Sequence, residues 1–232
     1  MSMLKKYLTV FFILLPLLVL AASEQEELFN RGNEYLKQKK YDLALKDFNK
    51  LIELEPDNAK FYFFRGIVYE IQKKHDLAVI DFNKAIEIDP ENATVHYCRG
   101  IAYENLKSYN LAITDYTKAI EFDSKNVKYY INRGWCFFIT GSQTNALIDF
   151  NSALAVNKNH YGTYINLALY HLYYKKNKEK ALEYFEKSFS LGCDPYRKEF
   201  YQDDIHEDGH YMKDIISDER FKALQKKYKK KG

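Results

Sequence analysis

The sequence predicts an all-α protein, an α-solenoid built of repeated helical hairpins. Three observations predict this class. The sequence matches itself at an offset of 34 residues, each copy holds two runs of apolar residues at helical spacing, and polar or proline-containing segments separate those runs. A period of this length is typical of helix-turn-helix repeats, in which each copy packs mainly on its neighbours.

Residues 1–23 have the three parts of a secretory signal peptide. Two lysines precede an almost wholly apolar run, residues 8–20, and small residues close the segment. The run is shorter than the roughly 20 residues that cross a bilayer, and Pro16 interrupts it. We therefore expect cleavage after Ala22 or Ser23 and an exported protein, located in a periplasm or cell envelope or secreted. A retained N-terminal membrane anchor is the alternative.

Residues 25–160 contain four complete copies of the repeat, which share five aligned columns. The columns are Gly32, Gly66, Gly100 and Gly134; Arg31, Arg65, Arg99 and Arg133; Tyr35, Tyr69, Tyr103 and Phe137; Ala44, Ala78, Ala112 and Ala146; and Phe48, Phe82, Tyr116 and Phe150. We expect the glycines and alanines where paired helices approach closely, and the aromatic residues in the core between them.

One copy, residues 59–92, shows how each hairpin is predicted. Apolar residues at i, i+3 and i+4 spacing indicate one helix before residue 72 and a second after residue 76. The polar segment 72–76 marks the turn between them. Pro90 ends the second helix, because proline cannot continue a helix.

The order of residues in this copy resembles the tetratricopeptide repeat (TPR) family, with Gly66, Tyr69, Ala78, Phe82 and Pro90 at the family's positions. The resemblance implies a TPR-type α-solenoid, a right-handed superhelix of helix-turn-helix repeats, over residues 24–194. The repeats are expected at about 25–58, 59–92, 93–126, 127–160 and 161–194. The fifth copy is weaker, with Ala168 in place of glycine and one extra residue before Ala181 and Phe185.

Residues 195–232 fall out of register with the repeat. The apolar spacing of Met212, Ile215, Phe221 and Leu224 predicts a helix. A solenoid needs a terminal element with one polar face to cover its last apolar surface. We therefore expect C-terminal capping helices here, followed by a basic tail of lysines.

Charge and composition narrow the range of partners. The formal net charge is +3, and two of these charges belong to the expected signal segment, so the remaining chain is nearly neutral. A chain-wide basic footprint for nucleic acid is absent, so we expect no nucleic-acid partner. Membrane contact is expected only through the N-terminal segment or the lysine tail, and no cofactor is expected.

The three cysteines, Cys98, Cys136 and Cys193, are widely spaced. Neighbouring cysteines therefore cannot form a zinc ribbon or a C-x-x-C redox site. We expect them to be small buried apolar residues, with a disulfide as the alternative that export would permit.

The resemblance implies that the first helix of each repeat lines a groove for a protein or peptide partner. Helical periodicity places one stripe on that face, six and three residues before the repeat glycine and one and four after it. We name this set the first-helix stripe. Its candidate binding residues are Phe29, Asn33, Lys60, Phe63, Ile67, Tyr97, Ile101, Lys128, Ile131, Trp135 and Phe138.

The first-helix stripe is unusually apolar, so we expect it to bind an apolar or aromatic segment, anchored by Trp135, Phe63 and Tyr97. The alternative is that these side chains pack against neighbouring helices. The carboxylate clamp of the family's chaperone-binding members is not expected, because Phe29 and Phe63 occupy places where a clamp lysine would stand.

The arginine column is matched by Asp47, Asp81, Asp115 and Asp149 on the second helices. An anion-binding ladder is one interpretation. Repetition in every copy favours the other, a recurring ion pair or hydrogen bond that fixes helix packing.

His206, Glu207 and His210 match the H-E-x-x-H pattern, in which two histidines bind zinc and the glutamate is the general base. A zinc-dependent hydrolase is therefore the alternative function. Asp208 and Gly209 are poor helix formers, and no large domain remains for a third ligand. We expect a non-catalytic scaffold or adaptor, with His206 and His210 as weak metal candidates only.

Overall fold

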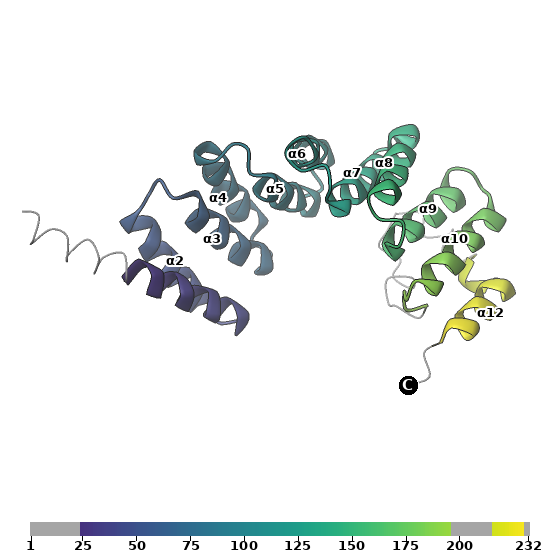
Figure 1. Ribbon diagram of the computed structural model, residues 1–232, viewed down its shortest axis with the longest axis horizontal. Helices are drawn as coiled ribbons and strands as arrows, with labels where there is room; N and C mark the ends of the chain where they lie inside the picture. Colours follow the sequence, from purple (N-terminus) through teal and green to yellow (C-terminus); the bar gives the residue numbers. More distant parts are fainter. Residues whose placement is uncertain (1–23, 196–214, 230–232) are drawn as a thin grey trace, which may run out of the picture. The chain divides into compact units, whose positions relative to one another are not determined.

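The computed structural model describes residues 24–195 and 215–229, and helices dominate both stretches (Figure 1). Residues 24–37 form the first helix. The later helices are α2 (Tyr41–Leu54), α3 (Ala59–Ile71), α4 (His75–Ile88), α5 (Ala93–Asn105), α6 (Tyr109–Phe122), α7 (Val127–Ile139), α8 (Gln143–Val156), α9 (Tyr161–Tyr173), α10 (Lys178–Ser190) and α12 (Glu219–Tyr228). The described residues contain no strand, and successive helix pairs follow the 34-residue period. The predicted all-α class is confirmed.

The chain divides into two compact units, and each has its own core. Unit 1 extends to Ser108 and unit 2 begins at Tyr109, so α5 belongs to the first and α6 to the second. A division of this kind is compatible with a repeat protein, because each repeat contacts only its neighbours and no single core spans the chain.

The core of unit 1 explains the glycine column. Phe48 and Phe82 are fully buried, and each ring lies against the backbone of the preceding helix. A Cβ atom added to Gly66 would stand only 2.7 Å from Cε1 of Phe82. Glycine therefore occupies this position because the aromatic ring fills the space of a side chain, as the sequence predicts.

The arginine column holds the hairpins together. The guanidinium of Arg65 donates to both carboxylate oxygens of Asp81, at 2.8 and 2.6 Å. The same bidentate pairing joins Arg31 to Asp47 and Arg133 to Asp149. Their packing role is confirmed.

The arginines of the second, third and fourth copies also reach the preceding copy. Arg65 Nη1 donates to Asn49 Oδ1 at 2.7 Å, and Arg133 Nη1 donates to the hydroxyl of Thr117 at 3.1 Å. Arg99 makes the equivalent bond to Asn83, also at 2.7 Å. One side chain thus fixes both the hairpin and the step to its neighbour.

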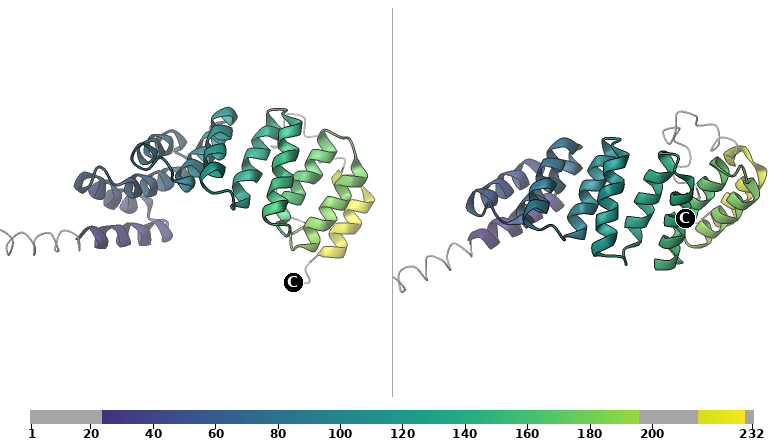
Figure 2. Two further views of the ribbon diagram at one scale, coloured as in Figure 1. Left: turned by 45° about the horizontal axis from the view of Figure 1, so that its top comes forward. Right: turned by 90° about the horizontal axis from the view of Figure 1, so that it is seen from above.

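Unit 2 ends in residues 215–217 and α12, which pack against α10 and which we call the cap. Figure 2 shows α7 to α10 side by side in a row, with α12 at its end. Ile215 and Phe221 are fully buried against Phe185 and Phe189 of α10. The Phe221 ring meets that of Phe185 edge-on, at 5.2 Å between centroids. The cap therefore covers the apolar face that the last repeat would otherwise expose.

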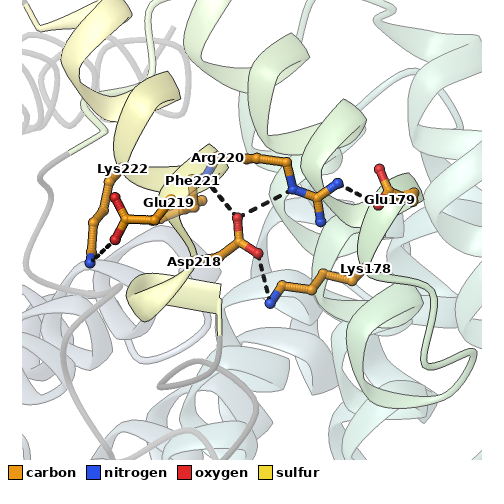
Figure 3. A network of polar contacts seen from close by, with 7 residues as sticks. All are labelled: Lys178, Glu179, Asp218, Glu219, Arg220, Phe221 and Lys222. Atoms are coloured by element: carbon orange, nitrogen blue, oxygen red, sulfur yellow. Dashed lines mark hydrogen bonds and ion pairs between the residues drawn. The ribbon is translucent and has the colours of Figure 1, made fainter.

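A polar network fixes the start of α12 (Figure 3). The Asp218 carboxylate accepts from the backbone N–H groups of Arg220 and Phe221, at 2.8 and 3.3 Å, and so caps the helix. Lys178 of α10 lies 2.8 Å from its other oxygen, and Arg220 pairs with Glu179. These hydrogen bonds, above all that from Lys178, lower the pKa of Asp218 well below its usual range.

The three cysteines all lie in the described part of the chain and are not bonded to one another. Cys136 and Cys193 are buried, which agrees with the packing interpretation, and Cys98 is partly buried. Burial, with a smaller contribution from nearby Glu70, raises the pKa of the Cys98 thiol to about 12. Cys98 is therefore a poor nucleophile.

Among the residues that the structure describes, no helix combines the length and apolarity needed to span a membrane.

Candidate functional surface

In unit 1 the first-helix stripe is a band of partly buried apolar side chains. Phe29, Phe63, Ile67, Tyr97 and Ile101 are all partly buried, and the first three pack against the core clusters of this unit. The Phe29 ring, for example, lies 5.0 Å from that of Phe64 in an edge-on contact. The stripe thus does some core packing, as the alternative interpretation holds, and leaves apolar surface open.

Lysine and asparagine members of the stripe have defined local contacts. Lys60 is exposed, and its Nζ stands 3.7 Å from the centre of the Phe29 ring, a close cation–π contact. The Asn33 amide donates to the backbone carbonyl of Phe29 at 2.9 Å, within its own helix. Lys128 of α7 is exposed.

A cleft of about 530 Å³ opens beside Lys60 and Phe63, between the starts of α3 and α5. Its other lining residues are Asn58, Ala59, Asp89, Asn92, Thr94 and Val95. Asn58 and Asn92 cap the two helices through their side-chain oxygens, and Asn92 also donates to Asp89 at 2.8 Å. The cleft therefore combines hydrogen-bonded polar side chains with apolar surface, including one aromatic ring.

An apolar line leads away from this cleft along α3. Phe63, Ile67 and Ile71 follow each other at four-residue spacing, so they share one face of the helix. Ile71, at the end of α3, is 48% exposed. We call these three residues the apolar track, which begins at the cleft with Phe63 and ends at the turn before α4 with Ile71.

In unit 2 the prediction for Phe138 is wrong. Its side chain is only 2% exposed and belongs to a core cluster with Ala146, Phe150 and Leu167. Tyr174 closes over it, with its hydroxyl donating to the Phe138 carbonyl. An aromatic residue four positions after the glycine is covered here because the end of α9 brings tyrosines onto it.

The other predicted residues of unit 2 remain at the surface. Ile131 and Trp135 are partly exposed on α7. The Trp135 indole stacks on the Phe138 ring, with centroids 5.1 Å apart and planes at 11°. Phe138, predicted to be a binding residue but buried instead, therefore holds the Trp135 ring in a fixed orientation.

Sequence reasoning missed Asn58, Asp89, Asn92 and Ile71. The first three lie at hairpin boundaries, where the sequence pattern predicts only that a helix ends. The asparagines recur at the 34-residue offset, as Asn58, Asn92 and Asn126. This recurring asparagine column could have indicated that these positions have a shared structural role.

The H-E-x-x-H residues His206, Glu207 and His210 lie outside the described residues, in segment 196–214. Within the described ranges, no group of three or more histidine, cysteine or acidic side chains is placed to hold a metal ion.

The repeat region of the chain matches known protein families. Residues 29–93 and residues 93–126 each match a family profile described as tetratricopeptide repeat. A search of the curated proteins finds no match.

Solved structures of repeat proteins resemble the chain over most of its length. A crystal structure of MamA protein is 18% identical, covers 77% of this chain and 95% of its own, and gives a TM-score of 0.66. MamA from Desulfovibrio magneticus RS-1 is 17% identical, with coverage of 72% and 94% and a TM-score of 0.67. YrrB, described as a TPR protein with an unusual peptide-binding site, is 25% identical, with coverage of 71% and 84% and a TM-score of 0.61. The MamA likenesses concern the fold.

Proposed function

This chain is a tetratricopeptide repeat protein, and from that premise we propose that it is a non-catalytic scaffold or adaptor that binds a protein or peptide segment on its first-helix stripe. One observation carries the proposal. The repeat columns fill the core, yet Phe63, Ile67 and Ile71 form an additional apolar track that begins at a cleft. The peptide-binding description of YrrB supports it.

The apolar track suits a segment with apolar or aromatic side chains, which would cover Phe63 in unit 1 or Trp135 in unit 2. Both rings are already oriented by neighbours, Phe63 by Phe82 at 6.1 Å and Trp135 by Phe138. Little side-chain entropy is lost when a partner binds to such preorganised rings. Large aromatic side chains of this kind commonly dominate interface energies.

Peptides selected from a displayed library of random short sequences provide the test. If Phe63 or Trp135 is an anchor, its replacement by alanine should weaken binding of the selected peptides by about 30-fold. Ile71→Ser should weaken it too, and this exposed residue has no core role, so a loss there would not reflect misfolding.

Ile80→Ala and Ile148→Ala are matched controls, because both isoleucines are exposed on second helices, at 61% and 56%. Their affinities should equal that of the wild type. Unchanged affinity for the peptides in Phe63→Ala, Trp135→Ala and Ile71→Ser, or equal losses in the controls, would refute binding on the stripe.

We also propose that the protein works outside the cytosol, in a cell envelope or secreted, and that residues 1–23 direct its export. Support comes from the lysine, apolar and small-residue order of that segment. Fractionation of the source cells with N-terminal sequencing should give a chain that starts near Ser23 or Glu24. A cytosolic chain that keeps Met1 would contradict the proposal.

A further inference from the structure

Three lysines of unit 1 hold a backbone conformation that normally favours glycine. Lys39 and Lys73 have φ of 60°, and Lys107 has φ of 58°. They occupy the same position in successive copies, in the turn between the two helices of a repeat. In the fourth copy this position is Gly141, with φ of 80°. A side chain in this region is strained, and glycine is not.

The turn itself does not need a lysine. The Lys73 N–H donates to the Glu70 carbonyl, and the Lys74 N–H to that of Tyr69, both at 2.9 Å. Gly141 and Ser142 make the corresponding bonds to Phe138 and Phe137. Strained residues that the fold does not require are often kept for function.

These turns collect positive charge on one edge of unit 1. We use the name basic edge for five exposed lysines of these turns, Lys39, Lys40, Lys73, Lys74 and Lys107. No ion pair joins any of them to a carboxylate among the described residues. Three exposed acidic residues lie near them. Glu34 is offset by the exposed Lys37, 3.9 Å away, which leaves Asp42 and Asp76 in the first turns of α2 and α4, so the edge keeps a positive surplus.

Side-chain contacts align this edge with the apolar track. Glu70, near the end of α3, accepts from Asn105 Nδ2 at the end of α5, at 2.6 Å, and also contacts His75 at 2.9 Å. The turns that carry Lys73 and Lys107 therefore lie next to each other. Ile71, the last residue of the track, stands two positions before Lys73.

We propose that the basic edge binds acidic residues of the partner, so that the partner segment has apolar residues on the track with aspartate or glutamate next to them. The inference rests on the proposed function, because it needs a segment on the first-helix stripe. The partner segment is expected to be acidic because its charges must complement the positive charge of the basic edge. Continuity with the apolar track favours a protein segment over an anionic membrane as the source of that charge.

The experiment compares the wild type with an edge variant, Lys39→Gly, Lys73→Gly and Lys107→Gly combined. Glycine removes the charges and relieves the strain, so this variant should melt at a higher temperature than the wild type. A control variant, Lys46→Gln, Lys50→Gln and Lys84→Gln combined, removes as many charges from the second helices of the same unit. All three proteins are used to select peptides from the random displayed library, and to bind vesicles of phosphatidylcholine with and without an equal amount of phosphatidylglycerol.

Peptides selected by the wild type and by the control should be enriched in acidic residues beside apolar ones. The edge variant should bind them roughly 3- to 150-fold more weakly, as expected for three lost exposed ion pairs. Lower affinity together with higher thermal stability excludes misfolding.

Apolar peptides without acidic enrichment, bound equally by all three proteins, would overturn this inference and leave the proposed function intact. No selected peptides at all would contradict the proposed function itself. A third outcome would overturn the assignment of a protein partner. In it, the wild type and the control bind phosphatidylglycerol vesicles, the edge variant does not, and the selected peptides show no acidic enrichment. That result would show that the edge faces a membrane.

Discussion

At the scale of single residues, close packing decides the glycine column. The Cβ that alanine would add meets Phe82 at 2.7 Å for Gly66, and Phe48 at 3.1 Å for Gly32. Both rings are fully buried and cannot swing away freely. The two copies therefore differ in how tightly they enclose the same position.

Gly66→Ala should lower the free energy of unfolding by about 1–3 kcal/mol, because the added methyl group overpacks the Phe82 ring. Gly32→Ala should lower it by less. Chemical denaturation of both variants measures the difference, and an equal or reversed order would show that the ring contact does not set the cost.

Backbone strain at the turns can also be measured. Lys73→Gly should raise the free energy of unfolding by about 1 kcal/mol, since a residue with φ of 60° loses its steric penalty. Lys74 has φ of −91° and is the matched control. Lys74→Gly should bring no gain, and an equal gain in both variants would mean that charge, not strain, is responsible.

At the scale of elements, the cap depends on a carboxylate that must stay ionised. The pKa of Asp218 is lower in the folded chain than in the unfolded chain, mainly through Lys178. Its contribution to stability is therefore present above the ordinary carboxyl pKa, near 4, and is lost as pH falls further toward the folded value.

Docking of α12 should weaken below about pH 4, as followed by amide exchange of that helix. Asp218→Asn keeps a good helix cap and removes the charge, so it should weaken docking at neutral pH and flatten this pH dependence. A variant with the same pH dependence as the wild type would assign the acid sensitivity to other groups.

At the scale of the whole molecule, near-neighbour packing should make damage local. Phe221→Ala removes ring contacts with Phe185 and Phe189 and should cost about 3–5 kcal/mol. Amide exchange should then rise in α9 and α10 and stay unchanged in α2 to α4. Phe48→Ala in unit 1 should give the converse pattern, and a uniform rise in either variant would indicate one cooperative unit.

Periodicity predicted the scaffold well, because each column solves the same packing problem in every copy. Two such solutions are the contact of Gly66 with Phe82 and the ion pair of Arg65 with Asp81, and the 34-residue offset predicts both. Ala168, which replaces glycine in the fifth copy, is likewise buried.

Features that depend on one copy alone were harder to predict. Phe138 is buried because Tyr173 and Tyr174, at the end of α9, lie against its ring, and Tyr174 is 36 residues away in the sequence. The cleft beside Lys60 joins the end of one repeat to the start of the next, so no single helical pattern shows it.

The central claim is that partners bind on the first-helix stripe and not on the outer surface of the second helices. Photo-crosslinking tests it most directly, with the crosslinking amino acid placed at Ile67 or at Ile80 in otherwise identical chains. A selected peptide should crosslink from position 67 and not from position 80. Crosslinks from position 80 alone, or equally from both, would contradict the account.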